Sequence, residues 1–387
     1  MTPFDPFARV RAEEFPDLQG AYLDAASVTP LPECGRAAAE EMARARTRAH
    51  ELTDEHFSRP IDDARRNCAR LIGADPSEIA LGPNTSFGIN VAALGLDVPA
   101  GSTVLVPDRE FPANVYPWML NERLKLELVP GTSNGNPDEE RILDRLRDPD
   151  VSILAISSVQ FATGYAADLT RLGEACREAG VTFVVDAIQS LGQIPLDVRR
   201  ARIDVLASGG HKWLCGPFGA GFLYVRNEKQ DHLRPRSVGW QAMAASQQLD
   251  SLLEYGPDFV ADARRYEEGT ASFQDAAALA ASVALILDLG VDKIQGYLRE
   301  LLDPLRRWLH EAPEIEVLSE DASKNASAIL SFRTPAVETV HRMLRDAGVV
   351  CSLREGAIRV APHFYNLPEE ISHLTDALET ARANGWA

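Results

Sequence analysis

Short apolar runs without polar alternation recur along the chain, and segments with helical spacing of apolar residues separate them. Val181–Val185 and Ile203–Ala207 are two such runs, and Thr103–Val106 is a third. Runs of this kind are typical of strands buried on both faces of a parallel sheet. Residues 33–50 and 60–73 instead carry apolar residues at helical spacing among charged ones, which predicts amphipathic helices. The alternation predicts an α/β fold.

The last third of the chain has a different pattern, in which helices and short strands alternate in a smaller unit. From about residue 291 the sequence predicts a long helix, two strands, a helix, two more strands and a C-terminal helix. This order is typical of an α+β domain beside a doubly wound one. We therefore expect a large domain over residues 18–285. Residues 1–17, read as a short helix or arm, and residues 286–387 would form the small domain.

An acidic residue, Asp186, directly follows the apolar run at 181–185. Ligands of open α/β sheets bind outside the carboxyl ends of the strands, and Asp186 occupies this position in the predicted sheet. A carboxylate in such a place needs a cationic partner, and a protonated pyridine nitrogen is a suitable one. The alternative interpretation is that Asp186 caps the helix that follows it.

A lysine, Lys212, follows the run at 203–207 in the order Ser-Gly-Gly-His-Lys. Paired glycines allow a tight turn that brings the amine close to a ligand. A lysine that forms a Schiff base must be partly desolvated, so that its amine is neutral when it attacks an aldehyde. A lone lysine is more often a solvated surface charge. The combination with Asp186 and Gln189 favours the chemical interpretation.

The pattern D-A-x-Q-S, S-G-G-H-K-W and G-P-x-G-x-G resembles the class V aminotransferase family of fold-type I pyridoxal-phosphate enzymes. That family includes cysteine desulfurases, kynureninases and isopenicillin N epimerase-like proteins, and the resemblance extends over nearly the whole chain. The stretches E-F-P-A-N-V-Y-P-W and S-x-R-E-G-x-I-R-V-x-P-H-F-Y-N look most like the epimerase-like branch. The resemblance implies a large domain with a mostly parallel, seven-stranded sheet, a small C-terminal α+β domain, and pyridoxal 5'-phosphate as cofactor.

The resemblance also assigns the residues that would hold this cofactor. Lys212 would carry it, Asp186 would pair with the ring nitrogen, and Gln189 would reach the ring hydroxyl. His211 would bind phosphate or orient the lysine. Thr85 and Ser86 open a predicted helix whose free amides form a phosphate site, although in isolation they read as part of an N-cap.

Further cofactor contacts are implied with alternatives left open. Phe111 stands where desulfurases have a ring-stacking histidine, and it could stack in its place or be a core residue. Gln160 or Phe161 would lie near the ring oxygen, and the amide of Gln160 is the better hydrogen-bonding group. Ser208 lies one place from a phosphate-binding serine of many relatives. Thr270 would reach across a homodimer to the partner's phosphate.

Substrate binding is implied at the two ends of the chain. Arg359 would bind the α-carboxylate of an amino acid in a bidentate manner, unless it is a surface arginine on an edge strand. Arg354 is a weaker prediction, for a distal carboxylate. Ala25 and Ala26 lie in Y-L-D-A-A-S, which resembles the family's Y-L-D-x-A-A segment, and they would line the substrate mouth or simply end a strand.

The reaction is less constrained than the cofactor. Catalysis would begin with a substrate Schiff base (an external aldimine) and removal of the α-proton by Lys212. Because one lysine delivers the proton from one side, the expected reaction is of the aminotransferase type. The alternatives are β-elimination with carbon–sulfur cleavage, epimerisation, and a catalytically silent binding protein of this fold. Cys351 and Cys215 are expected to be structural, which argues against a persulfide mechanism.

Composition narrows the class of protein. With 387 residues, 45% apolar and 25% charged, the chain reads as a soluble two-domain globular protein. A formal charge of −18 argues against nucleic acid or an anionic membrane as partner. Five scattered cysteines without a C-x-x-C pattern predict reduced thiols and no metal site. No apolar N-terminal segment or membrane-length run is present, so we expect a cytoplasmic protein.

Overall fold

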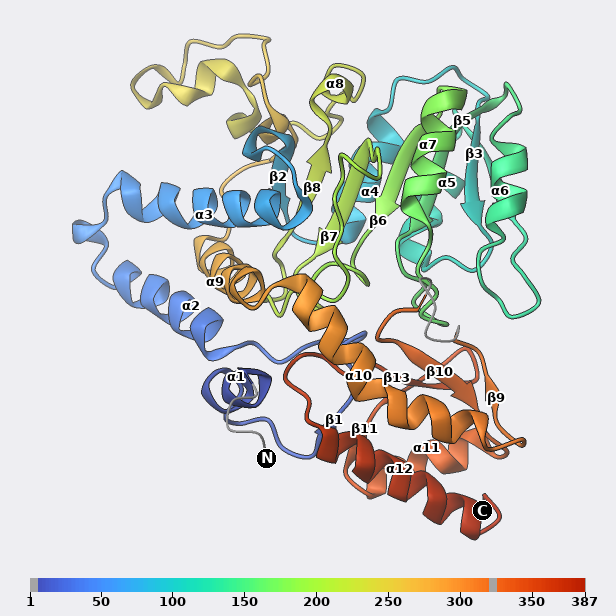
Figure 1. The fold of residues 1–387 in the computed structure, drawn as a ribbon. Helices are drawn as coiled ribbons and strands as arrows, with labels where there is room; N and C mark the ends of the chain where they lie inside the picture. Colours follow the sequence, from blue (N-terminus) through green and yellow to red (C-terminus); the bar gives the residue numbers. More distant parts are fainter. Residues whose placement is uncertain (1–5, 320–325, 387) are drawn as a thin grey trace.

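A seven-stranded sheet forms the centre of the larger part of the molecule in the computed structural model, which describes residues 6–319 and 326–386 (Figure 1). The strand order is β2-β8-β7-β6-β5-β3-β4, and among these strands β8 runs antiparallel to its neighbours. The mostly parallel sheet predicted from the apolar runs is confirmed. Its strands are β2 (Ile79–Gly82), β3 (Thr103–Pro107), β4 (Lys125–Val129), β5 (Val151–Ser157), β6 (Thr182–Asp186), β7 (Val205–Gly209) and β8 (Gly221–Val225).

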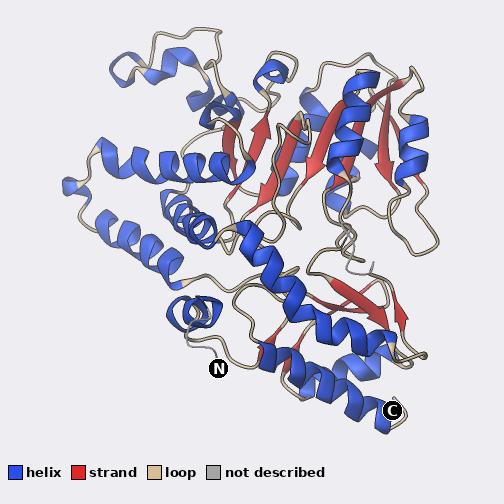
Figure 2. Ribbon diagram, in the orientation of Figure 1, coloured by secondary structure: helices blue, strands red, loops and turns tan. Residues whose placement is uncertain are grey.

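Helices bury this sheet on both faces, as Figure 2 shows. In β6, Phe183 and Val185 pack into one apolar cluster with Leu172 and Cys176 of α7. The side chain between them, Val184, joins a second cluster on the other face. Alternate side chains of a strand point to opposite faces, so an unbroken apolar run is the expected sequence of such a strand. The covering helices are α4 (Thr85–Gly95), α5 (Tyr116–Met119), α6 (Glu139–Arg145) and α7 (Leu169–Ala179).

A separate four-stranded antiparallel sheet, in the order β12-β13-β10-β9, lies with the C-terminal helices (Figure 1). The N-terminal strand β1 joins this part of the molecule by pairing in parallel with β11. Residues 1–5 of the predicted N-terminal arm lie outside the described residues. The elements are α1 (Pro6–Glu14), β1 (Ala21–Tyr22), α10 (Val291–His310), β9 (Glu316–Val317), β10 (Leu330–Arg333), α11 (Val337–Asp346), β11 (Val349–Val350), β12 (Ser352–Arg354), β13 (Ala357–Val360) and α12 (Pro368–Ala383).

Three helices form a further layer beside β2. Among them, α9 (Phe273–Leu289) packs against both α2 (Glu33–Arg46) and α3 (Asp54–Ile72). The helix predicted over 33–50 therefore ends at 46, and the helix predicted over 60–73 begins six residues earlier than expected. Its start is fixed by Thr53, whose backbone amide donates to the ring of His56 at 3.1 Å, so Pro60 lies inside the helix.

A segment with little regular structure connects β8 to α9. It contains α8 (Asn227–Gln230) and the short 3-10 turns η4 (Trp240–Ala242), η5 (Ala244–Gln247), η6 (Leu249–Ser251) and η7 (Ala263–Tyr266). Within it Trp240, Leu249, Leu253 and Tyr255 are exposed. Within the described ranges, the helices are too short or too polar to cross a lipid bilayer.

Candidate active site

A pocket of about 310 Å³ opens at the carboxyl ends of β6 and β7. Its position agrees with the rule that ligands of open α/β sheets bind outside the carboxyl ends of the strands. Most of the residues singled out in the sequence converge here. The lining consists of Ala26, Ser27, Asn84, Thr85, Ser86, Phe111, Ala113, Phe161, Asp186, Ile188, Gln189, His211, Lys212, Arg354 and Arg359.

Asp186 is the last residue of β6 and is only 2% exposed. In the sheet it lies opposite Ser157 of β5 and Ala207 of β7. Burial raises the pKa of its carboxyl to about 6, although the amide of Ile188, which donates to Oδ1 at 3.0 Å, and the charge of Lys212 act in the opposite direction. A cation placed beside Asp186 would favour its ionised form.

Lys212 lies three residues beyond β7, with its amine partly buried in the pocket. Burial lowers the pKa of this amine to about 8; Asp186 opposes the shift and Arg359 adds to it. Its Nζ is 5.4 Å from the ring centroid of Phe111. Among the described residues, none accepts a hydrogen bond from this Nζ. A substantial neutral fraction near pH 8 suits the amine for attack on an aldehyde.

The N-terminus of α4 forms another side of the pocket. Asn84 is the N-cap, and its side chain accepts a hydrogen bond from the amide of Phe87 at 2.9 Å. The hydroxyl of Thr85 accepts from the amide of Gly209 at 2.9 Å, which joins the helix to the end of β7. Ser86 is exposed at the start of the helix. Free amides and the positive end of the helix dipole make this terminus suitable for a phosphate.

His211 lines the pocket with its ring stacked on Phe218 at 5.4 Å between centroids. Burial and the neighbouring Lys212 lower the pKa of the imidazole. A side chain at Gly209 would place its Cβ about 3.2 Å from this ring and from Ile188. A serine at this position would therefore require the side chain of His211 or Ile188 to shift by a few tenths of an ångström.

The two glutamines predicted to contact the cofactor differ in whether their side chains reach the pocket. Gln189 lines the pocket, where its Nε2 donates to the carbonyl of Ala26 at 3.0 Å and its Oε1 accepts from Trp213 at 2.7 Å. The side chain of Gln160 is directed away from the pocket lining and donates to Glu110 at 2.9 Å. Phe161 lines the pocket in its place.

Ser208 is also not brought into the pocket. It is fully buried in β7, and its hydroxyl donates to the carbonyl of Gly209 at 3.2 Å. A contact between Ser208 or Gln160 and a bound cofactor would require these side chains to leave their present partners.

Arg359 on β13 is 2% exposed and is held by partners that the sequence did not identify. Its Nη2 donates to Ser27 at 2.8 Å and forms an ion pair with Asp24 at 3.3 Å. Its Nη1 donates to the carbonyl of Phe161 at 2.9 Å and its Nε to Ser352 at 3.1 Å. Burial lowers the pKa of this guanidinium to about 10, and Asp24 opposes the shift.

Arg354 is exposed at the rim of the same pocket, and it donates to Ser27 at 3.3 Å. Two guanidinium groups therefore converge on one hydroxyl. Asp24 was overlooked although it stands in the same Y-L-D-A-A-S segment as Ala26, because its role depends on contact with the far end of the chain.

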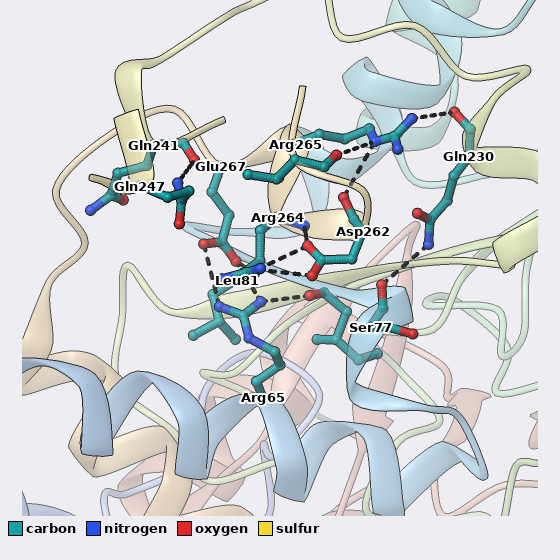
Figure 3. Close-up of polar contacts among 12 residues, drawn as sticks. Arg65, Ser77, Leu81, Gln230, Gln241, Gln247, Asp262, Arg264, Arg265 and Glu267 are labelled. Carbon is teal, nitrogen blue, oxygen red and sulfur yellow. Dashed lines mark hydrogen bonds and ion pairs between the residues drawn. The ribbon is translucent and has the colours of Figure 1, made fainter. Parts of the chain in front are cut away.

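Thr270 lies outside this pocket. It is exposed and lines a second pocket of about 240 Å³ together with Gly82 and Pro83, which directly precede Asn84. The segment before it is anchored by the ion pair between the buried Arg65 and the partly buried Glu267, with Nη1 and Oε1 2.7 Å apart (Figure 3). The backbone amide of Leu81 donates to the same Oε1 at 2.7 Å.

The thiols are buried or half-buried, and none lines the main pocket. Burial raises the pKa of Cys215 and Cys351 to about 12. Neither residue therefore offers a thiolate near neutral pH. Among the described residues, no three His, Cys, Asp or Glu side chains converge in a way that would hold a metal ion.

Comparison with known proteins agrees with this architecture. The chain is 30% identical to a probable cysteine desulfurase of Methanothermobacter thermautotrophicus, over 94% of this chain and 95% of the relative. It is 29% identical to the isopenicillin N epimerase of Streptomyces clavuligerus, over 82% and 83% of the two chains. The solved apo structure of a cysteine desulfurase from Thermococcus onnurineus superimposes with a TM-score of 0.87 at 25% identity, covering 99% of this chain and all of that one.

The family model described as aminotransferase class-V matches residues 21–373. This match includes the seven-stranded sheet, every residue that lines the pocket and most of the C-terminal sheet and helices. The chain therefore belongs to the aminotransferase class-V family.

Proposed function

We propose that this protein is a pyridoxal-phosphate enzyme that cleaves the carbon–sulfur bond of a sulfur-containing amino acid by β-elimination. The observation that carries the proposal is the content of the pocket, which has one amine, two guanidinium groups and an aromatic wall, and no thiol. The relatives named as cysteine desulfurases support sulfur chemistry. They favour this alternative over the transamination that we expected first from the sequence.

The residues present fit the cofactor. Asp186 offers a buried carboxylate to a ring nitrogen, Lys212 an amine to an aldehyde, and the N-terminus of α4 its amides to a phosphate, all in one pocket. Thr85, Ser86 and His211 would hold the phosphate end, Gln189 the ring hydroxyl, and Phe111 one ring face. When bound, pyridoxal phosphate supplies an electron sink for negative charge at the substrate Cα.

Lys212 is the group that would move protons. Once substrate has displaced it, its Nζ would accept the proton from Cα, because a pKa of about 8 leaves much of the amine neutral near that pH. In β-elimination the Cβ–S bond then breaks, and sulfur leaves with the bonding electron pair. Hydrolysis of the released three-carbon fragment gives pyruvate and ammonia.

No cysteine is needed in this scheme to receive sulfur. Cys351 lies between β11 and β12, is 8% exposed, and is followed by Arg359 after a short hairpin. A desulfurase that forms a protein persulfide needs an accessible thiolate, and burial raises the pKa of this thiol to about 12. We therefore propose that sulfur leaves in a small molecule.

Epimerisation is the second candidate, and the isopenicillin N epimerase relative is the observation that favours it. It requires a second acid on the side of Cα opposite Lys212. The other titratable residues that line the pocket are Asp186, His211 and the two arginines. Since we assign Asp186 to the ring nitrogen and His211 to the phosphate end, no acid is left for the opposite side of Cα. Elimination needs only Lys212 to move the α-proton, so we prefer it to epimerisation.

For substrate binding, we propose that Arg359 takes the α-carboxylate and that Arg354 at the rim takes a distal anionic group. Ala26 would form part of the mouth beside Ser27. We further propose a homodimer in which Thr270 reaches the partner's phosphate site. The exposed Thr270 and the exposed apolar side chains of residues 238–255 support a protein-covered surface on this side.

The decisive experiment follows the visible absorbance of the protein reconstituted with pyridoxal phosphate. We expect a lysine-bound cofactor band that is lost in Lys212→Ala, and release of pyruvate when cystine or cysteine is added. Cys351→Ala should retain this activity. Absence of the band in the wild type would refute cofactor attachment. A product that keeps the substrate's carbon skeleton with inverted configuration would instead establish epimerisation.

A further inference from the structure

A buried carboxyl group behind the pocket, Glu110, has no role in the scheme above. It is 6% exposed and accepts four hydrogen bonds. The donors are the amide of Ser157 at 2.8 Å, the hydroxyl of Ser157, the side chain of Asn114 at 3.1 Å and that of Gln160 at 2.9 Å. A buried carboxylate with several donors is costly to disturb, because each lost partner leaves a polar group unsatisfied.

These donors come from the two chain segments that form the aromatic side of the pocket. Phe111 directly follows Glu110, and Phe161 directly follows Gln160. The two rings meet edge to face at 5.3 Å, and both line the pocket. Through its carboxylate, Glu110 therefore links the segment that carries Phe111 to the segment that carries Phe161.

The same carboxylate also reaches the strand beside Asp186. Ser157, which donates to it twice, lies opposite Asp186 in the pairing of β5 with β6. Phe111 itself is 43% exposed, so packing alone holds its ring weakly. The anchor for the ring is therefore its neighbour in the sequence.

We propose that Glu110 is a positioning residue that fixes the aromatic wall of Phe111 and Phe161 relative to Lys212 and Asp186. This inference rests on the proposed function, since the wall matters for chemistry only if a cofactor ring lies against it. Glu110 acts through Phe111, Ser157 and Gln160 and does not line the pocket itself.

The test measures cofactor affinity and the circular dichroism of the bound cofactor in the visible range, which reports the orientation of its surroundings. Glu110→Gln keeps the size of the side chain but turns one acceptor into a donor. We expect cofactor binding to weaken roughly tenfold, as for the loss of one or two buried hydrogen bonds, with a smaller dichroic band. Glu139→Gln is the matched control, because Glu139 is a buried carboxylate outside the pocket that accepts from Tyr165 and Asp168.

A double-mutant cycle separates positioning from general stability. If Glu110 acts through the ring, Glu110→Gln should weaken binding much less in a Phe111→Ala background than in the wild type. Full additivity, or an unchanged dichroic band in Glu110→Gln, would overturn the inference while leaving the proposed function intact. A wild type that binds no cofactor at Lys212 would overturn both.

Discussion

Two glutamates beside the central sheet, the buried Glu110 and the partly buried Glu267, are held in opposite ways. Glu267 pairs with Arg65 (Figure 3). The Nη1 of Arg65 also donates to the carbonyl of Ile79 at 2.6 Å. Glu110 accepts only from neutral donors among the described residues. Each glutamate precedes, by one or three residues, a side chain predicted to contact the cofactor.

The difference follows from what lies near each carboxylate. Burial raises the pKa of Glu110 to about 7; the hydrogen bonds from Ser157 and Asn114 oppose this, and the charge of Asp186 adds slightly to it. An arginine paired with Glu110 would also lie near Asp186 and would compete with a cationic ring nitrogen for it. The Arg65–Glu267 pair anchors the Thr270 segment beside β2, which is the edge strand of the sheet. Asp186 lies on β6, three strands away, so this guanidinium does not compete for it.

Breaking the ion pair between Arg65 and Glu267 should have the largest effect on stability. Arg65→Met would leave the partly buried Glu267 without its cation, and we expect a loss of roughly 3 kcal/mol in the free energy of unfolding, the lower end of the range for buried ion pairs. Urea denaturation measures this directly. The double variant Arg65→Met with Glu267→Met is the control and should recover most of the loss. A single variant as stable as the wild type would remove the distinction between the two anchors.

The buried carboxyl of Glu110 should make the stability of the protein depend on pH. The folded-state pKa of Glu110, about 7, lies above its ordinary value of 4.5, so folding disfavours the ionised form. Its contribution to stability is therefore fully present at acid pH and is lost as the pH rises from about 4.5 to about 7. Relative to Glu110→Gln, the cofactor-free wild type should lose on the order of 2 kcal/mol over this range. Urea titrations at several pH values test the sign, and a wild type that instead gains stability would contradict it.

Thr270→Ala should affect binding and not folding. If its hydroxyl contributes one hydrogen bond to a partner's phosphate, cofactor affinity should fall about tenfold, or ~1.4 kcal/mol, with the urea midpoint unchanged. Ser272→Ala, two residues on at the start of α9, serves as the control. Equal effects of the two substitutions on cofactor affinity would mean that the Thr270 hydroxyl does not bind the phosphate, and that Glu267 holds this segment only for packing.

Asn114→Ala should have the smallest effect. It removes one of four donors to Glu110, so we expect a loss of about 1 kcal/mol in stability, with the cofactor still bound. Differential scanning calorimetry measures the melting temperature precisely enough to detect this loss of stability. A collapse as large as that of Arg65→Met would show that the neutral network is one indivisible unit.

The fold was predictable from sequence because burial on both faces leaves a direct mark on each strand. The run at 181–185 matches β6 to within one residue. The run at 203–207 begins too early, because Arg202 has a positive φ of 52° and the chain is still turning before Val205. Helix ends depended on side-chain caps such as Thr53, which periodicity does not show.

The site was predictable where single residues carry the motif, and less so where a loop decides the direction of a side chain. A shift of one position between Gln160 and Phe161 reverses which of them faces the pocket, and the sequence left both open. Glu110 was overlooked because glutamates in loops are usually exposed. Its position directly before the apolar residues of E-F-P-A-N was the available signal. The roles of the lining residues remain predictions until cofactor binding is measured.

The ion pair between Asp24 and Arg359 joins residues 335 positions apart in the chain. During synthesis at about 5–20 residues per second, Asp24 is made roughly 17–67 s before Arg359. For nearly all of that time β1 also lacks β11, the strand with which it pairs. The pocket can therefore form only after translation is nearly complete, because its wall includes Arg359.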